Sequence, residues 1–172
     1  MLLGGREYTM KKILLSGIIT ALILFMAIPA LAYDNTLYTI LYNNTNDKLL
    51  AMHVEGLENV DNSGTAIAFP GSLDNIKWEL TAWWLSYTTY RFSVDIWAVD
   101  ADAWDDESVP DHDDIPWEKV AELELICVNT FDLWPVFTEI YIKKMNVISG
   151  SFEAYTETYD DGINAKLRVI AE

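Results

Sequence analysis

The chain has 172 residues, with 27 acidic against 11 basic side chains, a net charge of −16 and a pI of about 4.2. This length fits one domain rather than a multidomain enzyme, and so negative a chain is repelled by the nucleic-acid backbone, which excludes phosphate-driven nucleic-acid binding. Apolar residues make up 51% of the chain and aromatic residues 13%, which excludes disorder over most of its length.

The first predicted element is a secretory signal peptide. Lys11 and Lys12 precede an uncharged stretch, residues 13–32, which ends in Ala30-Leu31-Ala32. A positive start, an apolar run and small residues at an A-x-A site are the parts of such a peptide. We expect cleavage after Ala32. The alternative is an uncleaved anchor, because a stretch of about 20 uncharged residues can span a bilayer.

Residues 33–172 are the predicted single domain, and residues 1–32 are the N-terminal extension and signal peptide, with Met10 as an alternative start of translation. The domain holds 26 acidic and 8 basic side chains, a net charge of −18, because the N-terminal segment carries Arg6, Glu7, Lys11 and Lys12. Cys127 is the only cysteine, so an internal disulfide and a lipid-anchored N-terminus are both excluded. We expect a soluble secreted or periplasmic domain with no membrane span after cleavage.

Side-chain alternation with a period of two dominates the domain, and no stretch has a convincing helical period. Clusters of Gly, Asn, Asp and Pro separate the candidate strands, which are 37–44, 49–54, 65–69, 76–84, 88–99, 120–129, 136–146, 151–158 and 163–171. Eight or nine short strands with such turns predict an all-β fold, namely an antiparallel β-sandwich, with a small β-barrel as the alternative.

The alternation also predicts two hairpins. The strands 76–84 and 88–99 share one apolar face if the opposed pairs are Ala82/Tyr90, Leu80/Phe92, Trp78/Val94 and Ile76/Ile96, which also puts Lys77 opposite Asp95. The last two strands turn at Tyr159-Asp160-Asp161-Gly162, and their expected pairs are Phe152/Val169, Ala154/Leu167, Thr156/Ala165 and Thr158/Ile163, with Glu153 opposite Arg168.

An acidic loop, residues 100–114, is the most distinctive local feature, with eight carboxylates and no basic side chain in fifteen residues. Ca²⁺ takes six to eight oxygen ligands, so the loop is a candidate calcium site with the ligands Asp100, Asp102, Asp105, Asp106, Asp111 and Asp113. The spacing departs from that of an EF-hand, because the sixth position is Asp105 rather than glycine. The alternative is a solvated loop that keeps the protein soluble.

Tryptophans beside this loop are the candidate ligand-binding residues. Trp97 falls on the polar face of its strand, and Trp104 and Trp117 flank the loop, whereas Trp78 and Trp84 are expected in the core. Flat indole rings next to carboxylates are typical of glycan-binding surfaces, since the rings stack on sugar C–H groups while carboxylates accept hydroxyl hydrogen bonds. The alternative is that these rings pack against the second sheet or a loop.

Catalytic residues are not evident. Cys127 is expected to be a buried, inert thiol, His53 a partly buried strand residue, and His112 a weak zinc candidate among carboxylates. We therefore expect a non-enzymatic domain that binds a glycan or another extracytoplasmic partner, such as an envelope protein, through the Trp-flanked acidic loop. The alternatives are a glycoside-directed hydrolase that uses two carboxylates and a structural envelope or surface protein with no small-molecule ligand.

Overall fold

Nine strands and one short helix form in the part of the chain that the structure describes. The computed structural model describes residues 32–83, 86–104, 115–131 and 135–172. All nine strands coincide with the predicted ones and most extend further at one or both ends. They are β1 (Ala32–Asn43), β2 (Lys48–Glu58), β3 (Ser63–Ala68), β4 (Ser72–Trp83), β5 (Ser86–Asp100), β6 (Glu118–Phe131), β7 (Pro135–Val147), β8 (Phe152–Tyr159) and β9 (Asn164–Ala171), and helix α2 is Ala101–Trp104.

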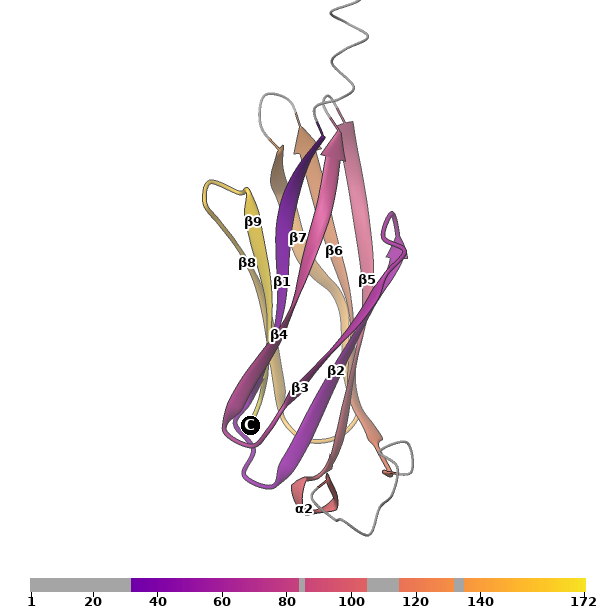
Figure 1. Cartoon of the computed structure of the whole chain (residues 1–172), viewed down its shortest axis with the longest axis vertical. Coiled ribbons are helices and arrows are strands. Elements are labelled where there is room, and N and C mark those ends of the chain that lie inside the picture. Colours follow the sequence, from indigo (N-terminus) through magenta and orange to yellow (C-terminus); the bar gives the residue numbers. More distant parts are fainter. Residues whose placement is uncertain (1–31, 84–85, 105–114, 132–134) are drawn as a thin grey trace, which may run out of the picture. The chain divides into compact units, whose positions relative to one another are not determined.

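The strands pair into two sheets (Figure 1). One has the order β4-β1-β9-β8 and the other the order β3-β2-β5-β6-β7. The predicted all-β, sandwich-like fold is confirmed, and the described strands do not close into a barrel. The expectation of purely antiparallel sheets is wrong at one pair, because β1 and β9 run parallel. These strands come first and last in the domain, so no short hairpin connection forces them to be antiparallel.

The hydrophobic core lies between the two sheets and is built from alternate residues of most strands. Residues 33–172 form one compact unit around it. The four-stranded sheet contributes Leu37, Leu41 and Trp78 to this core, and the five-stranded sheet contributes Phe92 and Val94. The rings of Trp78 and Phe92 meet with their centroids 5.3 Å apart. The expected burial of Trp78 is confirmed, while Trp84 lies outside the described residues.

The predicted hairpin between residues 76–84 and 88–99 is wrong. β4 belongs to the four-stranded sheet beside β1, whereas β5 lies in the other sheet between β2 and β6. Lys77 forms an ion pair with Glu79 of its own strand, and Asp95 forms one with Lys119 of β6. The apolar faces of β4 and β5 do face each other, but across the core rather than side by side in one sheet.

The β8–β9 hairpin exists, but its register differs from the predicted one by two residues. Phe152 pairs with Ala171, and the closing pair is Tyr159 with Asn164. The turn places Asp160 and Asp161 in the left-handed region, at φ of 52° and 56°, in addition to Gly162 at 85°. A shift of two keeps every side chain on its predicted face, although the expected Glu153/Arg168 pair is lost.

Polar side chains bridge the two sheets at several points. Asn43 of β1 is fully buried, and its Nδ2 donates hydrogen bonds to the carbonyl oxygens of Lys48 in β2 and Ala68 in β3, at 2.7 and 2.8 Å. The Oγ1 of Thr156 in β8 donates to the carbonyl oxygen of Ile140 in β7, at 3.0 Å. These bonds connect side chains of the four-stranded sheet to backbone carbonyl oxygens of the five-stranded sheet.

Candidate functional site

The end of the sandwich at α2 carries several of the residues that the sequence nominates. β5 ends at Asp100 and passes directly into α2, a single helical turn (Figure 1). Beneath this turn lies a small apolar cluster, separate from the main core, whose buried members are Leu49, Val99 and Ile115. Burial of these three side chains holds α2 against β2 and β5, because apolar area removed from water stabilises the contact.

Three aromatic rings gather at this end. Trp104 and Trp117 meet edge to face with their ring centroids 6.1 Å apart, and Trp104 meets Phe69 in the same manner at 6.5 Å. Both tryptophans are half-buried and pack against the small apolar cluster, whereas Phe69 is 49% exposed. We call Phe69, Trp104 and Trp117 the aromatic cluster. Sequence reasoning missed Phe69, which lies outside the acidic loop at the end of β3.

Trp97 does not belong to this cluster. It lies in β5 opposite Ala51 of β2 and Lys119 of β6, and it is half-buried. The ring contacts found among the described residues do not join it to Trp104 or Trp117. The structure therefore brings together two of the three predicted ligand-binding tryptophans, and the binding role of all three stays a prediction.

A hollow of about 550 Å³ lies at the start of α2, and Ala103, which packs against the same small apolar cluster as Trp104 and Trp117, is among its lining residues. The hollow is not lined by any of the three rings of the aromatic cluster. Its lining includes Asn46 and three acidic residues, Asp47, Asp100 and Asp102, which are all exposed. The Oδ1 atom of Asp100 lies 2.5 Å from the Nζ of Lys48, and this hydrogen bond raises the pKa of the lysine. The hollow is thus rich in hydrogen-bond acceptors, and the ion pair with Lys48 neutralises the charge of Asp100.

Only two of the six predicted calcium ligands fall in the described part of the chain. Asp100 and Asp102 line the hollow, while Asp105, Asp106, Asp111 and Asp113 lie outside the described residues, as does His112. Among the described residues, no three acidic, histidine or cysteine side chains are grouped so as to hold a metal ion. Calcium binding therefore remains a prediction that needs residues from 105–114.

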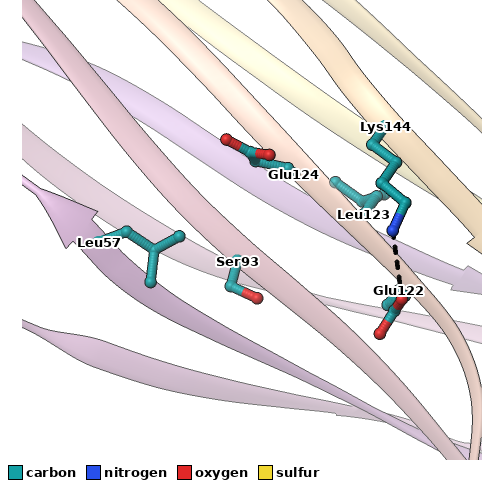
Figure 2. Close-up of a pocket in the computed structure, with 6 residues that line it drawn as sticks. All are labelled: Leu57, Ser93, Glu122, Leu123, Glu124 and Lys144. Atoms are coloured by element: carbon teal, nitrogen blue, oxygen red, sulfur yellow. Dashed lines mark ion pairs between the residues drawn. The ribbon is translucent and has the colours of Figure 1, made fainter.

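A second, smaller hollow of about 210 Å³ lies over the five-stranded sheet, and Figure 2 shows the residues that line it. Glu122 and Glu124 of β6 enter it beside Leu57, Ser93 and Lys144. Each charged lining residue has an ion-pair partner, and Lys144 lies 3.9 Å from Glu122 (Figure 2). The volume is below the roughly 300–1,000 Å³ of typical ligand pockets. The hollow resembles an ordinary charged sheet surface.

A ladder of ion pairs crosses this surface. The Nζ of Lys119 lies 2.8 Å from Asp95 and 2.9 Å from Glu122, and Lys143 lies 2.9 Å from Glu124. Hydrogen bonds from Lys119 and then from Asn146 lower the pKa of Glu122, and its contacts with Asp95 and Glu122 raise the pKa of Lys119. We did not predict this ladder from the sequence, although most of its members, the glutamates and Lys119 of β6 and the lysines of β7, follow one another closely there.

Cys127 and His53 are the cysteine and the histidine that fall among the described residues, and each lies in a strand of the five-stranded sheet. Cys127 is fully buried, and burial raises the pKa of its thiol, so the thiolate needed for nucleophilic attack is disfavoured. His53 is half-buried, and its Nδ1 lies 3.1 Å from the Oγ1 of Thr65 on the neighbouring strand β3. The expected environments of Cys127 and His53 are both confirmed.

No helix among the described residues is long and apolar enough to cross a membrane. Comparison of the chain with protein-family models, curated proteins and solved structures found no match, so inferences about its function depend on the geometry above.

Proposed function

We propose that this protein is an exported, non-enzymatic binding domain that takes a glycan at the α2 end of the sandwich. The observation that carries the proposal is that α2 contributes both to the aromatic cluster of Phe69, Trp104 and Trp117, through Trp104, and to an acceptor-lined hollow of about 550 Å³, through Ala101, Asp102 and Ala103. Rings supply flat apolar area for sugar C–H faces, and their packing against one another fixes their orientation before a ligand arrives.

Charge supports an uncharged or cationic ligand at this end. Asp47, Asp100 and Asp102 provide carboxylate acceptors for sugar hydroxyls, and Asn46 adds an amide that both donates and accepts. An anionic glycan would be repelled, since Lys48 is the one cation that the described residues place near these carboxylates. We therefore expect the ligand to be a neutral oligosaccharide.

Export is the second part of the proposal. The sequence features at residues 11–32 support a signal peptide that is cleaved after Ala32, and the acidic domain that follows would act outside the cytoplasm. Intact-mass analysis of the protein recovered from a secreting host is expected to show Tyr33 as the N-terminal residue. Recovery of the uncleaved chain from the membrane fraction would contradict this part.

The glycan proposal is tested with the purified protein on a neutral-glycan array, followed by titration of a hit with tryptophan fluorescence as the readout. Phe69→Ala removes an exposed ring and is expected to weaken binding about tenfold, the effect of roughly 1.4 kcal/mol. Leu73→Ala is the matched control, because Leu73 is similarly exposed, at 53% against 49%, and lies on β4, the next strand along the chain, which belongs to the other sheet. Equal effects of the two substitutions would contradict the proposal.

Two further measurements separate the other functional classes. Thermal unfolding in millimolar calcium and then in EDTA examines the acidic loop, and an unchanged midpoint would remove the calcium hypothesis. Turnover of chromogenic glycosides would contradict the non-enzymatic role and favour a hydrolase. Failure to bind any glycan on the array would favour the structural surface protein instead.

A further inference from the structure

A further cavity, distinct from the hollow at the α2 end and from the hollow over the five-stranded sheet, opens where β4 and β5 diverge into different sheets. Its volume is about 440 Å³, within the range of small-molecule pockets. The lining combines the β2–β3 turn, which supplies Asn59 and Asp61, with Glu79 and Thr81 of β4 and with Thr88 and Tyr90 of β5. We call this cavity the crevice.

The crevice is held in shape by hydrogen bonds between the elements that form it. The Nδ2 of Asn59 donates to the carbonyl oxygen of Thr89 in β5 at 2.8 Å, which fixes the turn against that strand. The hydroxyl of Tyr90 donates to the carbonyl oxygen of Thr81 at 2.7 Å, which joins β5 to β4. Asn59 itself is held in the left-handed region, at φ of 59°. A cavity fixed in this way orders few groups when a ligand binds.

The polar lining of the crevice favours a cation. Asp61 and Glu79 contribute two carboxylates, the two threonines contribute hydroxyls that can accept, and none of the described residues that line the cavity is a lysine or an arginine. Lys77 reaches Glu79 from outside the lining, at 2.8 Å, and so competes for only one of the two carboxylates. The net charge of −18 over residues 33–172 adds a field that concentrates cations near the surface.

The apolar part of the lining discriminates between classes of ligand. The partly buried Val60 supplies aliphatic surface, whereas Leu80 and Tyr90 are each only 2% exposed, so the described lining offers no open aromatic face for a sugar to stack on. Methylene groups suit such an aliphatic wall, while ammonium groups suit the carboxylates through charge-assisted hydrogen bonds. We propose that the crevice binds a small aliphatic diamine or polyamine, a class different from the glycan proposed for the α2 end.

The probes are 1,4-diaminobutane and spermidine, titrated into the purified ¹⁵N-labelled protein at 0.15 M salt and followed by amide chemical shifts. The expected result is saturable binding, with the largest shifts at residues 59–61, 79–81 and 88–90. Asp61→Asn and Glu79→Gln are each expected to weaken binding about tenfold, since each removes one charge-assisted hydrogen bond. Glu153→Gln removes the same charge from an exposed site on β8 and is expected to change affinity less than twofold.

Three results would overturn the proposal. The first is an equal loss of affinity in Asp61→Asn, Glu79→Gln and Glu153→Gln, which would mean attraction by net charge alone. The second is shifts that spread over the surface without saturating. The third is tighter binding of 1,4-butanediol, which lacks charge, than of the diamine. Phe69→Ala is expected to leave diamine binding unchanged, so failure of the crevice and failure of the glycan site can be distinguished.

Discussion

Asn43 is the position at which one substitution should most clearly reveal how the two sheets are joined. Its side chain is fully buried at the end of β1 and makes four hydrogen bonds. The Nδ2 donates to the carbonyl oxygens of Lys48 and Ala68, and the Oδ1 accepts from the backbone N–H of Thr45 at 3.1 Å and from its Oγ1 at 2.6 Å. Every donor and acceptor of the amide is therefore engaged.

The expected cost of Asn43→Ala follows from these partners. The carbonyl of Ala68 is left without its donor in a buried setting, at about 1–3 kcal/mol, and the other bonds, which lie nearer to water, are worth about 0.5–1.5 kcal/mol each. The separate terms sum to about 2.5–7.5 kcal/mol. Because the four bonds belong to one amide and such terms are not additive, we expect a value near the lower end, about 3–4 kcal/mol, which is a large part of the 5–15 kcal/mol that typically stabilises a domain. With a urea slope of about 1.5 kcal/mol/M, the unfolding midpoint should fall by about 2 M.

The assay is urea unfolding followed by tryptophan fluorescence, with Asn44→Ala as the matched control. Asn44 is the next residue and its side chain is exposed, so its truncation should stay within about 0.5 kcal/mol of wild type. Asn43→Asp adds a pH test, because a carboxylate would face two carbonyl oxygens and its pKa should be raised. The penalty should then be full at neutral pH and shrink on acidification. A loss below about 1 kcal/mol in Asn43→Ala would refute the reasoning, since one buried unpaired carbonyl alone exceeds it.

Three further predictions concern stability. Cys127 should not react with a thiol reagent until the protein is unfolded, and Cys127→Ser should cost about 1–3 kcal/mol by placing a hydroxyl in an apolar core, as urea titration would show. Lys119→Met should remove the largest cause of the lowered pKa of Glu122, while the hydrogen bond from Asn146 stays. The ion pair stabilises the folded state at pH values above the pKa of the carboxyl group in the unfolded chain, and this stabilisation is lost as pH falls through the lowered pKa of the folded state. The difference in unfolding free energy between the variant and wild type should therefore narrow from pH 7 to pH 3. Gly56→Ala should cost about 2 kcal/mol in thermal unfolding, because its Cβ would lie 2.2 Å from the carbonyl oxygen of Val60; a neutral effect would mean that the β2–β3 turn moves freely.

Alternation of side chains was sufficient to predict the strands and which of their faces are buried. It could not predict which strands are neighbours, and the error at β4 and β5 shows the reason. Trp78 and Phe92 do contact each other, as expected for strands that share a core. Contact across a sandwich and contact along one sheet require the same apolar pattern, so the pattern does not distinguish them. The predicted pairing of Lys77 with Asp95 was wrong for a similar reason, because Lys77 forms its ion pair with Glu79 and Asp95 forms its ion pair with Lys119.

The candidate site was predictable only in part. Trp104 and Trp117 flank a conspicuous acidic loop, so the sequence nominated them, and the structure does bring their rings together. Phe69 carries no local signal, because its proximity to Trp104 arises from the way β3 is placed beside β2. The crevice was missed entirely for the same reason. Its residues come from three separate elements whose adjacency depends on β4 and β5 parting into different sheets.

The parallel pairing of β1 with β9 has a consequence for the order in which the domain can fold. β9 follows all the other described strands in the sequence, yet it is the strand that connects the β1–β4 half of its sheet to β8. The other sheet is assembled mainly from sequence neighbours, including the successive pairs β2–β3, β5–β6 and β6–β7. Pairing β1 with β9 closes a much longer loop than pairing successive strands does, and contacts between residues far apart in the sequence form slowly. The five-stranded sheet should therefore nucleate first, and the sheet that contains β1 should be completed only after the eight-residue β9 has joined it.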